Sequence, residues 1–222
     1  MATTGLVADS AGSYKPLRKA LEKIRSDGTR SIIHLGGIFV NGIHPEDVST
    51  VKLLRELDIS ALKGISDYSI AKKLVQEWRT GKERLVACGY SQKDIDYIYT
   101  MGTHRPGSDG FTFGHSSMTL SDDARTLAGV EDAICGFSKL KSYCQDPGKR
   151  PRTGTVRVYV RGDSKKNFLV RETEEGVSVL EPEFGERTDF ADMNYPCLVA
   201  VSAVKEGNYA LLNSDFVIFD KI

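Results

Sequence analysis

The chain has 222 residues, of which 40% are hydrophobic and 27% are charged, so it is long and apolar enough to build one compact domain with a sizeable core. Its 30 basic and 30 acidic residues cancel, which argues against a global attraction to nucleic acid or to an anionic membrane. No stretch approaches the apolar length of a membrane span. We therefore expect a single domain over residues 1–222 that does not act at a membrane.

The four cysteines show neither C-x-x-C nor zinc-finger spacing, and they lie at Cys88, Cys135, Cys144 and Cys197. Scattered cysteines of this kind are typical of free thiols in a cytosolic protein. The first strand begins almost at Met1, which leaves no room for a signal peptide. Both features predict a cytoplasmic location.

The N-terminal third alternates strand and helix patterns. In chain order these predict a strand, a helix, a strand, a helix and a turn over residues 5–9, 15–25, 31–36, 46–56 and 64–67. Within the first helix, Leu17, Leu21 and Ile24 keep one face apolar at helical spacing. Alternation of this kind predicts an α/β fold.

The rest of the chain changes from helices to strands. Residues 69–78 read as an amphipathic helix, and one or two helices are expected within 121–143. From residue 155 onward we expect strands over 155–160, 168–172, 177–180, 197–204, 209–212 and 216–220. The last of these carries consecutive apolar residues, which predicts a strand buried on both faces.

Short motifs rich in glycine and aspartate follow several of these strands. They read D-S-A-G-S at 9–13, G-G-I-F-V-N-G at 36–42, G-I-S-D at 64–67, F-T-F-G-H at 111–115 and G-D-S-K at 162–165. In order and spacing they resemble the motifs of the calcineurin-like metallophosphoesterases, in particular the small bacterial and archaeal phosphodiesterases. The resemblance implies a two-sheet β-sandwich flanked by helices, a four-layer α/β/β/α architecture with the site at the strand ends.

The resemblance also implies that the family's metal ligands are largely lost. The family's first motif is D-x-H-G-N; here Asp9 is kept, but Ala11 stands where the metal-binding histidine would be. In the second motif, G-D-x-x-x-x-G, Gly37 replaces the aspartate that bridges the two metals. In the third, G-N-H-D, the ligating asparagine is Ile65 and the catalytic histidine is Ser66.

Of the two C-terminal motifs, the first keeps its metal-binding residue and the second does not. His115 occupies the position of a metal-binding histidine at a strand end. The final motif, G-H-x-H, has Asp163 and Lys165 in place of both histidines. Asp67, which ends the third motif, is kept as well.

These substitutions bear directly on the family's chemistry, which uses two metal ions roughly 3.5–4 Å apart to bind phosphate and activate water. Gly37 has no side chain to bridge two metals, and Ala11 and Ile65 cannot donate to one. The hydroxyl of Ser66 holds its proton too tightly to serve as a general acid near neutral pH. We therefore expect a degenerate, catalytically inactive member without a cofactor.

Losing the metals would leave Asp9 and Asp163 as unpaired carboxylates, which is a costly arrangement if they are buried. One hypothesis is that the ammonium of Lys165 replaces the cation and pairs with one or both. The alternative, that Lys165 points into solvent, stays open.

A mononuclear remnant is the rival interpretation of the same residues. Asp9, His115 and Asp163, with Asp67 as a further donor, offer oxygen and imidazole ligands suited to Mn²⁺, Zn²⁺ or Mg²⁺.

Three functions follow from these alternatives. The first is an inactive protein that binds a protein partner or a phosphate-bearing small molecule, with Ser66, Ser164 and Lys165 as candidate phosphate contacts. The second is an active phosphoesterase with a rebuilt mononuclear site, and the third is a purely structural subunit. Homo-oligomers are consistent with each.

The basic run at 149–152 is typical of a solvated surface loop, so binding of nucleic acid is not expected. His104 lies in a glycine- and proline-rich segment and is expected in a loop, where a role in a lid over the site is the alternative, whereas His34 is expected to be packed within a strand.

Overall fold

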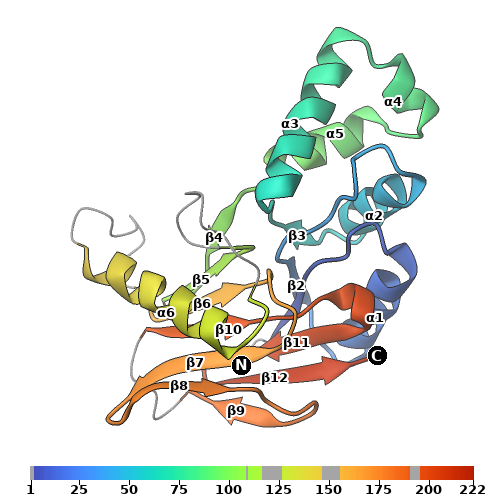
Figure 1. Cartoon of the computed structure of the whole chain (residues 1–222). Helices are drawn as coiled ribbons and strands as arrows, with labels where there is room; N and C mark the ends of the chain where they lie inside the picture. Colours follow the sequence, from blue (N-terminus) through green and yellow to red (C-terminus); the bar gives the residue numbers. More distant parts are fainter. Residues whose placement is uncertain (1–2, 109, 117–126, 147–155, 191–195) are drawn as a thin grey trace.

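The computed structural model describes residues 3–108, 110–116, 127–146, 156–190 and 196–222. Within them, two mixed sheets of six strands stack face to face and helices cover both outer faces (Figure 1). This is the expected four-layer sandwich. None of the described helices is long and apolar enough to cross a membrane.

The first sheet has the strand order β3-β2-β1-β11-β12-β9. Its strands span Ser60–Ala61, Ser31–His34, Thr4–Val7, Asn208–Leu212, Phe216–Lys221 and Arg187–Asp189, in that order. β1 and β2 are parallel, with Gly5 opposite Ile32, and β11 returns antiparallel to β1.

The second sheet has the order β4-β5-β6-β10-β7-β8. Its strands span His104–Pro106, Phe111–Gly114, Val158–Arg161, Cys197–Ala200, Phe168–Thr173 and Gly176–Leu180. β5, β6 and β10 run parallel to one another, so their carboxyl ends meet at one edge of the sheet.

The helices fall into three groups. α1 (Tyr14–Ser26) and α2 (Pro45–Glu56) lie over the first sheet, and α6 (Val130–Gln145) lies over the second. α3 (Ile65–Thr80), α4 (Glu83–Ala87) and α5 (Gln92–Thr100) form a lobe that projects from the sandwich (Figure 1). A 3₁₀ turn, η1, spans Val204–Glu206.

Apolar side chains fill each layer boundary. Leu17, Leu21 and Ile24 of α1 are fully buried against the first sheet, as their helical spacing predicts. Between the sheets lie residues such as Leu6, Val160 and Phe219, and Phe137 of α6 is buried against the second sheet.

The expected elements hold with a few corrections. β12 is not buried on both faces: Val217 and Phe219 are fully buried, whereas Phe216 and Ile218 are half-buried and alternate with them. His104 begins β4 rather than lying in a loop, and it is half-buried. Only one helix, α6, lies in the described part of 121–143, and the basic run at 149–152 lies outside the described residues.

Candidate functional site

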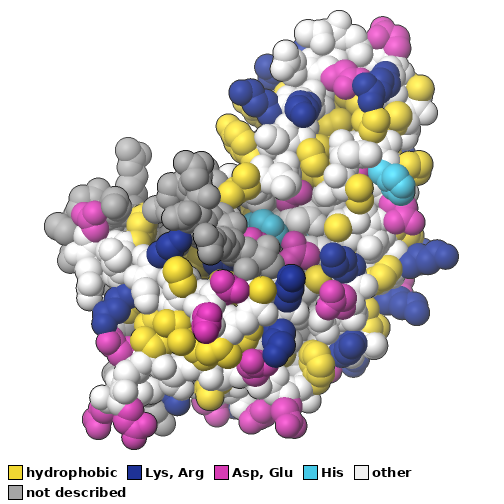
Figure 2. All heavy atoms as spheres, in the orientation of Figure 1, with side chains coloured by type: hydrophobic (Ala, Val, Ile, Leu, Met, Phe, Trp, Pro, Cys, Tyr) yellow, Lys and Arg dark blue, Asp and Glu magenta, His cyan; other side chains and the backbone are white. Residues whose placement is uncertain are grey.

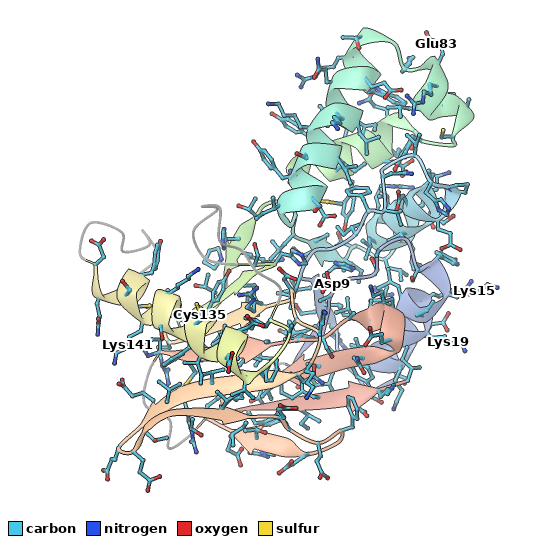
Figure 3. All side chains as sticks on the ribbon, in the orientation of Figure 1. Asp9, Lys15, Lys19, Glu83, Cys135 and Lys141 are labelled. Carbon is cyan, nitrogen blue, oxygen red and sulfur yellow. The ribbon has the colours of Figure 1, made fainter. Side chains whose placement is uncertain are left out.

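The five motifs meet at one edge of the sandwich, where parallel strands end. Asp9 follows β1, Gly36 follows β2, His115 follows β5 and Asp163 follows β6. Figure 3 shows Asp9 beneath the base of α3, where the ends of the strands meet the helical lobe. The two sheets approach closely here, because a Cβ atom at Gly162 would lie 2.8 Å from the Cβ atoms of Ala8 and Leu35.

The first two motif loops are held together by backbone hydrogen bonds. The N–H groups of Asp9, Ala11 and Gly12 donate to the carbonyls of residues 36, 37 and 38 over 2.8, 2.7 and 3.0 Å. Asp9 and Ala11 have φ of 50° and 41°, in the left-handed region that favours glycine. The surrounding structure therefore imposes this conformation on the loop.

Asp67 organises the second and third motifs. Its carboxylate accepts four backbone hydrogen bonds, from the N–H groups of Gly37, Ile38, Phe39 and Gly64 over 2.7 to 3.1 Å. It is almost completely buried. Because both oxygens are engaged, Asp67 serves the backbone of the loop and is not a free metal ligand.

Asp47 of α2 has the same role for the end of the second motif. It accepts hydrogen bonds from the N–H groups of Val40, Asn41 and Gly42 over 2.8, 3.1 and 2.7 Å. Asp47, near the start of α2, thus supports the loop's shape.

His115 and Asp9 form one of the ionisable pairs of the site. Nε2 of His115 lies 3.7 Å from Oδ1 of Asp9, and Nδ1 lies 3.1 Å from the Leu35 carbonyl. A carbonyl only accepts, so Nδ1 carries the proton in the neutral ring and Nε2 faces Asp9. Burial lowers the pKa of His115, partly offset by Asp67 and Asp163, so the ring is neutral at neutral pH.

Asp9 is in an unusual electrostatic setting. Burial, with the nearby carboxylates of Asp163 and Asp67, raises the pKa of Asp9 from 3.8 to about 8, against the opposing charges of Lys205 and Arg161. The Asp9 side chain is therefore mostly protonated at neutral pH when no cation is bound beside it.

Two glycines surround the imidazole ring of His115. A Cβ atom at Gly36 would lie 2.7 Å from Cγ of His115, and one at Gly64 would lie 2.7 Å from Nε2. The ring thus fills the space between the second and third motifs. Both glycines are required because real Cβ atoms do not come this close to a ring.

Gly37 stands where the resemblance to the metallophosphoesterases places a bridging aspartate. A Cβ atom there would lie 2.8 Å from Cα of Asp9 and closer still to its Oδ1. With φ of 72°, Gly37 also has a backbone conformation that favours glycine. The space that a bridging carboxylate needs is occupied by Asp9 itself.

The cation near Asp163 is Arg161, not Lys165. Nη2 of Arg161 donates to the Asp163 carbonyl over 3.2 Å and lies 3.6 Å from its carboxylate. Arg161 is only 4% exposed, whereas Lys165 is exposed and has no ion pair within the described residues. The hypothesis that Lys165 takes the place of the metal cation is therefore wrong, because the buried cation beside Asp163 is Arg161. The sequence signal for this role was an arginine at the end of the buried strand V-Y-V-R.

The three candidate phosphate contacts are not equivalent. The Ser164 hydroxyl is buried and donates to backbone carbonyls of Leu127 and Lys166. Ser66 is exposed in the first turn of α3, and Lys165 is exposed beyond β6. Within the described residues, no hydrogen bond or ion pair joins Ser66 to Lys165.

The remaining histidines are structural. His34 is fully buried, and its ring contacts the Ser10 hydroxyl at 3.0 Å and the Gly36 N–H at 3.1 Å. Burial lowers the pKa of His34 to about 3. The ring of His104 lies 6.3 Å from that of Tyr159.

The donors do not fit the family's metal centre. Among the described residues, no group of three or more His, Cys, Asp or Glu side chains is placed to hold a metal ion. The eroded positions Ala11, Gly37 and Ile65 offer no replacement donor. We derive no metal-dependent step from this arrangement.

No protein-family model matches the sequence, and no curated protein matches it significantly. Solved structures do match. A metallophosphoesterase from Sphaerobacter thermophilus shares 17% identity over 99% of this chain and 88% of that chain, with a TM-score of 0.67. The chain has the metallophosphoesterase fold.

Two further structures agree. The hypothetical protein PH1004 from Pyrococcus horikoshii OT3 is 15% identical, over 100% of this chain and 88% of that one, with a TM-score of 0.59. A putative diadenosine tetraphosphatase is 13% identical, over 99% and 93%, with a TM-score of 0.50. At these identities the metallophosphoesterase likeness is one of fold, and the function must be argued from the site.

Proposed function

We propose that this chain is a catalytically inactive protein of the metallophosphoesterase fold that binds a protein partner or a phosphate-bearing ligand at the former catalytic edge. One observation carries the proposal: the motif loops keep their backbone hydrogen bonds while the metal donors are gone. Asp67 alone accepts four backbone N–H groups across two motifs. Loops that keep a defined backbone shape but lack metal donors are suited to binding without catalysis.

The local packing supports the loss of activity. Restoring a carboxylate at Gly37 is blocked by Asp9, and the neutral ring of His115 packs against Gly36 and Gly64. The general acid of the family's third motif is replaced by Ser66.

The composition of the edge supports binding. Val40 in the second motif, Ile65 in the third and Tyr68 directly after it are large apolar side chains that are 55%, 45% and 51% exposed. Figure 2 shows hydrophobic side chains gathered along the lower part of α3. This apolar rim favours a protein partner.

Charge and helix geometry support a phosphate group at the same edge. Lys63 lies near Asp67 and Lys205 near Asp9, as their effects on the pKa values there indicate. Ser66 is exposed in the first turn of α3, where backbone N–H groups and the helix dipole favour an anion.

Two other functions remain as alternatives. An active phosphoesterase would need one metal at Asp9, His115 and Asp163, and a structural subunit would need neither ligand nor metal. Either could form a homo-oligomer.

The first test is the metal content of protein purified without chelator, paired with hydrolysis of bis(p-nitrophenyl) phosphate in added Mn²⁺. We expect no stoichiometric metal, and no turnover above the level of the Asp9→Ala variant. Near-stoichiometric metal with turnover that Asp9→Ala abolishes would overturn the proposal in favour of a mononuclear hydrolase.

The second test addresses binding. Inorganic phosphate and a mononucleotide are titrated while the thermal midpoint is recorded, and Ser66→Ala should reduce any stabilisation. Ser69→Ala, an exposed serine one turn along α3, is the matched control and should not. A lack of stabilisation by either anion, together with a lack of any partner in native-mass measurements, would favour the structural subunit.

A further inference from the structure

A second recess lies at the opposite end of the strands from the motif edge. It has a volume of about 520 Å³ and lies where β2 and β3 begin, beside the end of α5. A neighbouring recess of about 300 Å³ opens between the two sheets, beneath β4 and the end of β11. Ser31 and Arg105 line both recesses, which are therefore adjacent, and we call the two together the basal groove.

The short strand β3 creates this groove. β3 pairs only with Ile33 and His34, so the beginning of β2 at Ser31 and Ile32 is paired with β1 on one side and has no strand on the other. β4, the edge strand of the other sheet, supplies the facing wall with Arg105. The groove thus belongs to the fold itself, and its combined volume lies in the range of small-molecule sites.

Two cations face the basal groove. Arg30 and Arg105 both line it, from the segment before β2 and from β4. Within the described residues neither guanidinium forms a hydrogen bond or an ion pair. Asp58 is the one carboxylate among the lining residues, so cations outnumber anions there and an anionic ligand is favoured.

The remaining polar lining consists mainly of hydroxyl groups. They come from both sheets and from α5, and belong to Thr4, Ser31, Ser60, Thr100, Ser108 and Ser214. Side-chain hydroxyls and the Asp58 carboxylate are complementary to the hydroxyl groups of a polyol, because each can accept from a ligand O–H. Guanidinium groups match the geometry of phosphate.

We propose that the basal groove is a binding site for a hydroxylated organic phosphate, a sugar phosphate in chemical class. Arg30 and Arg105 hold the phosphate, and the hydroxyl-bearing residues with Asp58 hold the polyol. This site is separate from the motif edge, because Ser31 begins the strand whose far end leads to Gly36.

The test uses glucose 6-phosphate as the probe, with glucose and inorganic phosphate as comparators, by calorimetry on the intact chain. We expect saturable binding that is tighter for the probe than for either comparator. Arg30→Gln and Arg105→Gln should each weaken it by about tenfold, which corresponds to the loss of one charge-assisted contact. Lys19→Gln, which removes an exposed positive charge from α1, is the matched control and should leave the affinity unchanged.

Backbone amide shifts separate this site from the motif edge. Binding in the basal groove should move the signals of Ser31, Ser60 and Gly107 and leave those of Gly12 and Gly64 in place. Shifts confined to Gly12 and Gly64, or binding that is abolished by Ser66→Ala and not by Arg105→Gln, would place the anion at the motif edge and overturn the proposal. So would the absence of saturable binding by properly folded protein.

Discussion

Position 37 and the backbone of Asp9 are so close that a Cβ atom at Gly37 would lie 2.8 Å from Cα of Asp9. A flexible side chain can rotate away from such a contact, whereas a Cα atom moves only with its backbone. The backbone of Asp9 is itself tied to Gly36 by a 2.8 Å hydrogen bond. Position 37 therefore has no room for a side chain unless the backbone of Asp9 moves.

Introducing a carboxylate at position 37 should destabilise the protein. We expect Gly37→Asp to lower the free energy of unfolding by at least about 2 kcal/mol, from the contact with Asp9 combined with backbone strain at φ of 72°. Gly28→Asp is the matched control, because Gly28 has φ of 84° and open space around it, so only about 1 kcal/mol of strain is expected. Urea denaturation measures both. A stable Gly37→Asp variant that binds Mn²⁺ would show that the site is still open.

The stability of the motif edge should depend on the positive charge of Arg161. Removing it leaves Asp163 and Asp9 without their nearest buried positive charge, so Arg161→Met should cost about 3–5 kcal/mol of stability. If the variant folds, the pKa of Asp9, followed by NMR, should rise further. Lys165→Met is the control and should change stability by less than about 0.5 kcal/mol, because Lys165 is exposed. The reverse ranking would restore the Lys165 hypothesis.

Asp9 should give the protein a distinctive dependence of stability on pH. Its pKa rises from 3.8 to about 8 on folding, so the native state holds a proton that the unfolded chain has already released between these values. The contribution of Asp9 is therefore complete below about pH 4 and is lost as the pH rises toward 8, by up to about 1.4 kcal/mol per pH unit. Asp9→Asn should remove this slope, measured by denaturation in the presence of EDTA. An unchanged slope would mean that Asp9 is ionised in the native state.

Asp67 should hold the motif loops by its charge. In Asp67→Asn one oxygen becomes an NH₂ group that would face backbone N–H donors, so about 3 kcal/mol of stability should be lost. Amide hydrogen exchange should show that protection is lost first at Gly37, Ile38 and Phe39. Asp96→Asn, an exposed carboxylate on α5, serves as the control. If the protection of the loop survives in Asp67→Asn, other contacts hold the loop.

The order of the longer strands and helices could be predicted from the sequence because it depends on local periodicity, whereas the short strands β4 and β9 were not predicted. Leu17, Leu21 and Ile24 are spaced for one helix face, and that face is buried as expected. That positions 11, 37 and 65 offer no metal donor could also be predicted, because the side chains of alanine, glycine and isoleucine lack donor atoms in any conformation. Position along the chain was enough for both.

The contacts within the site were decided only by the tertiary structure, because they depend on distances between segments far apart in the chain. That Arg161 rather than Lys165 accompanies Asp163 follows from burial: Arg161 ends β6 inside the sandwich, and Lys165 lies beyond it. Asp9 closes position 37 where two neighbouring strands of the first sheet end, and His115 of the second sheet packs between Gly36 and Gly64. Sequence periodicity carries no information on these distances, because they are set by how the strands pair and how the two sheets pack.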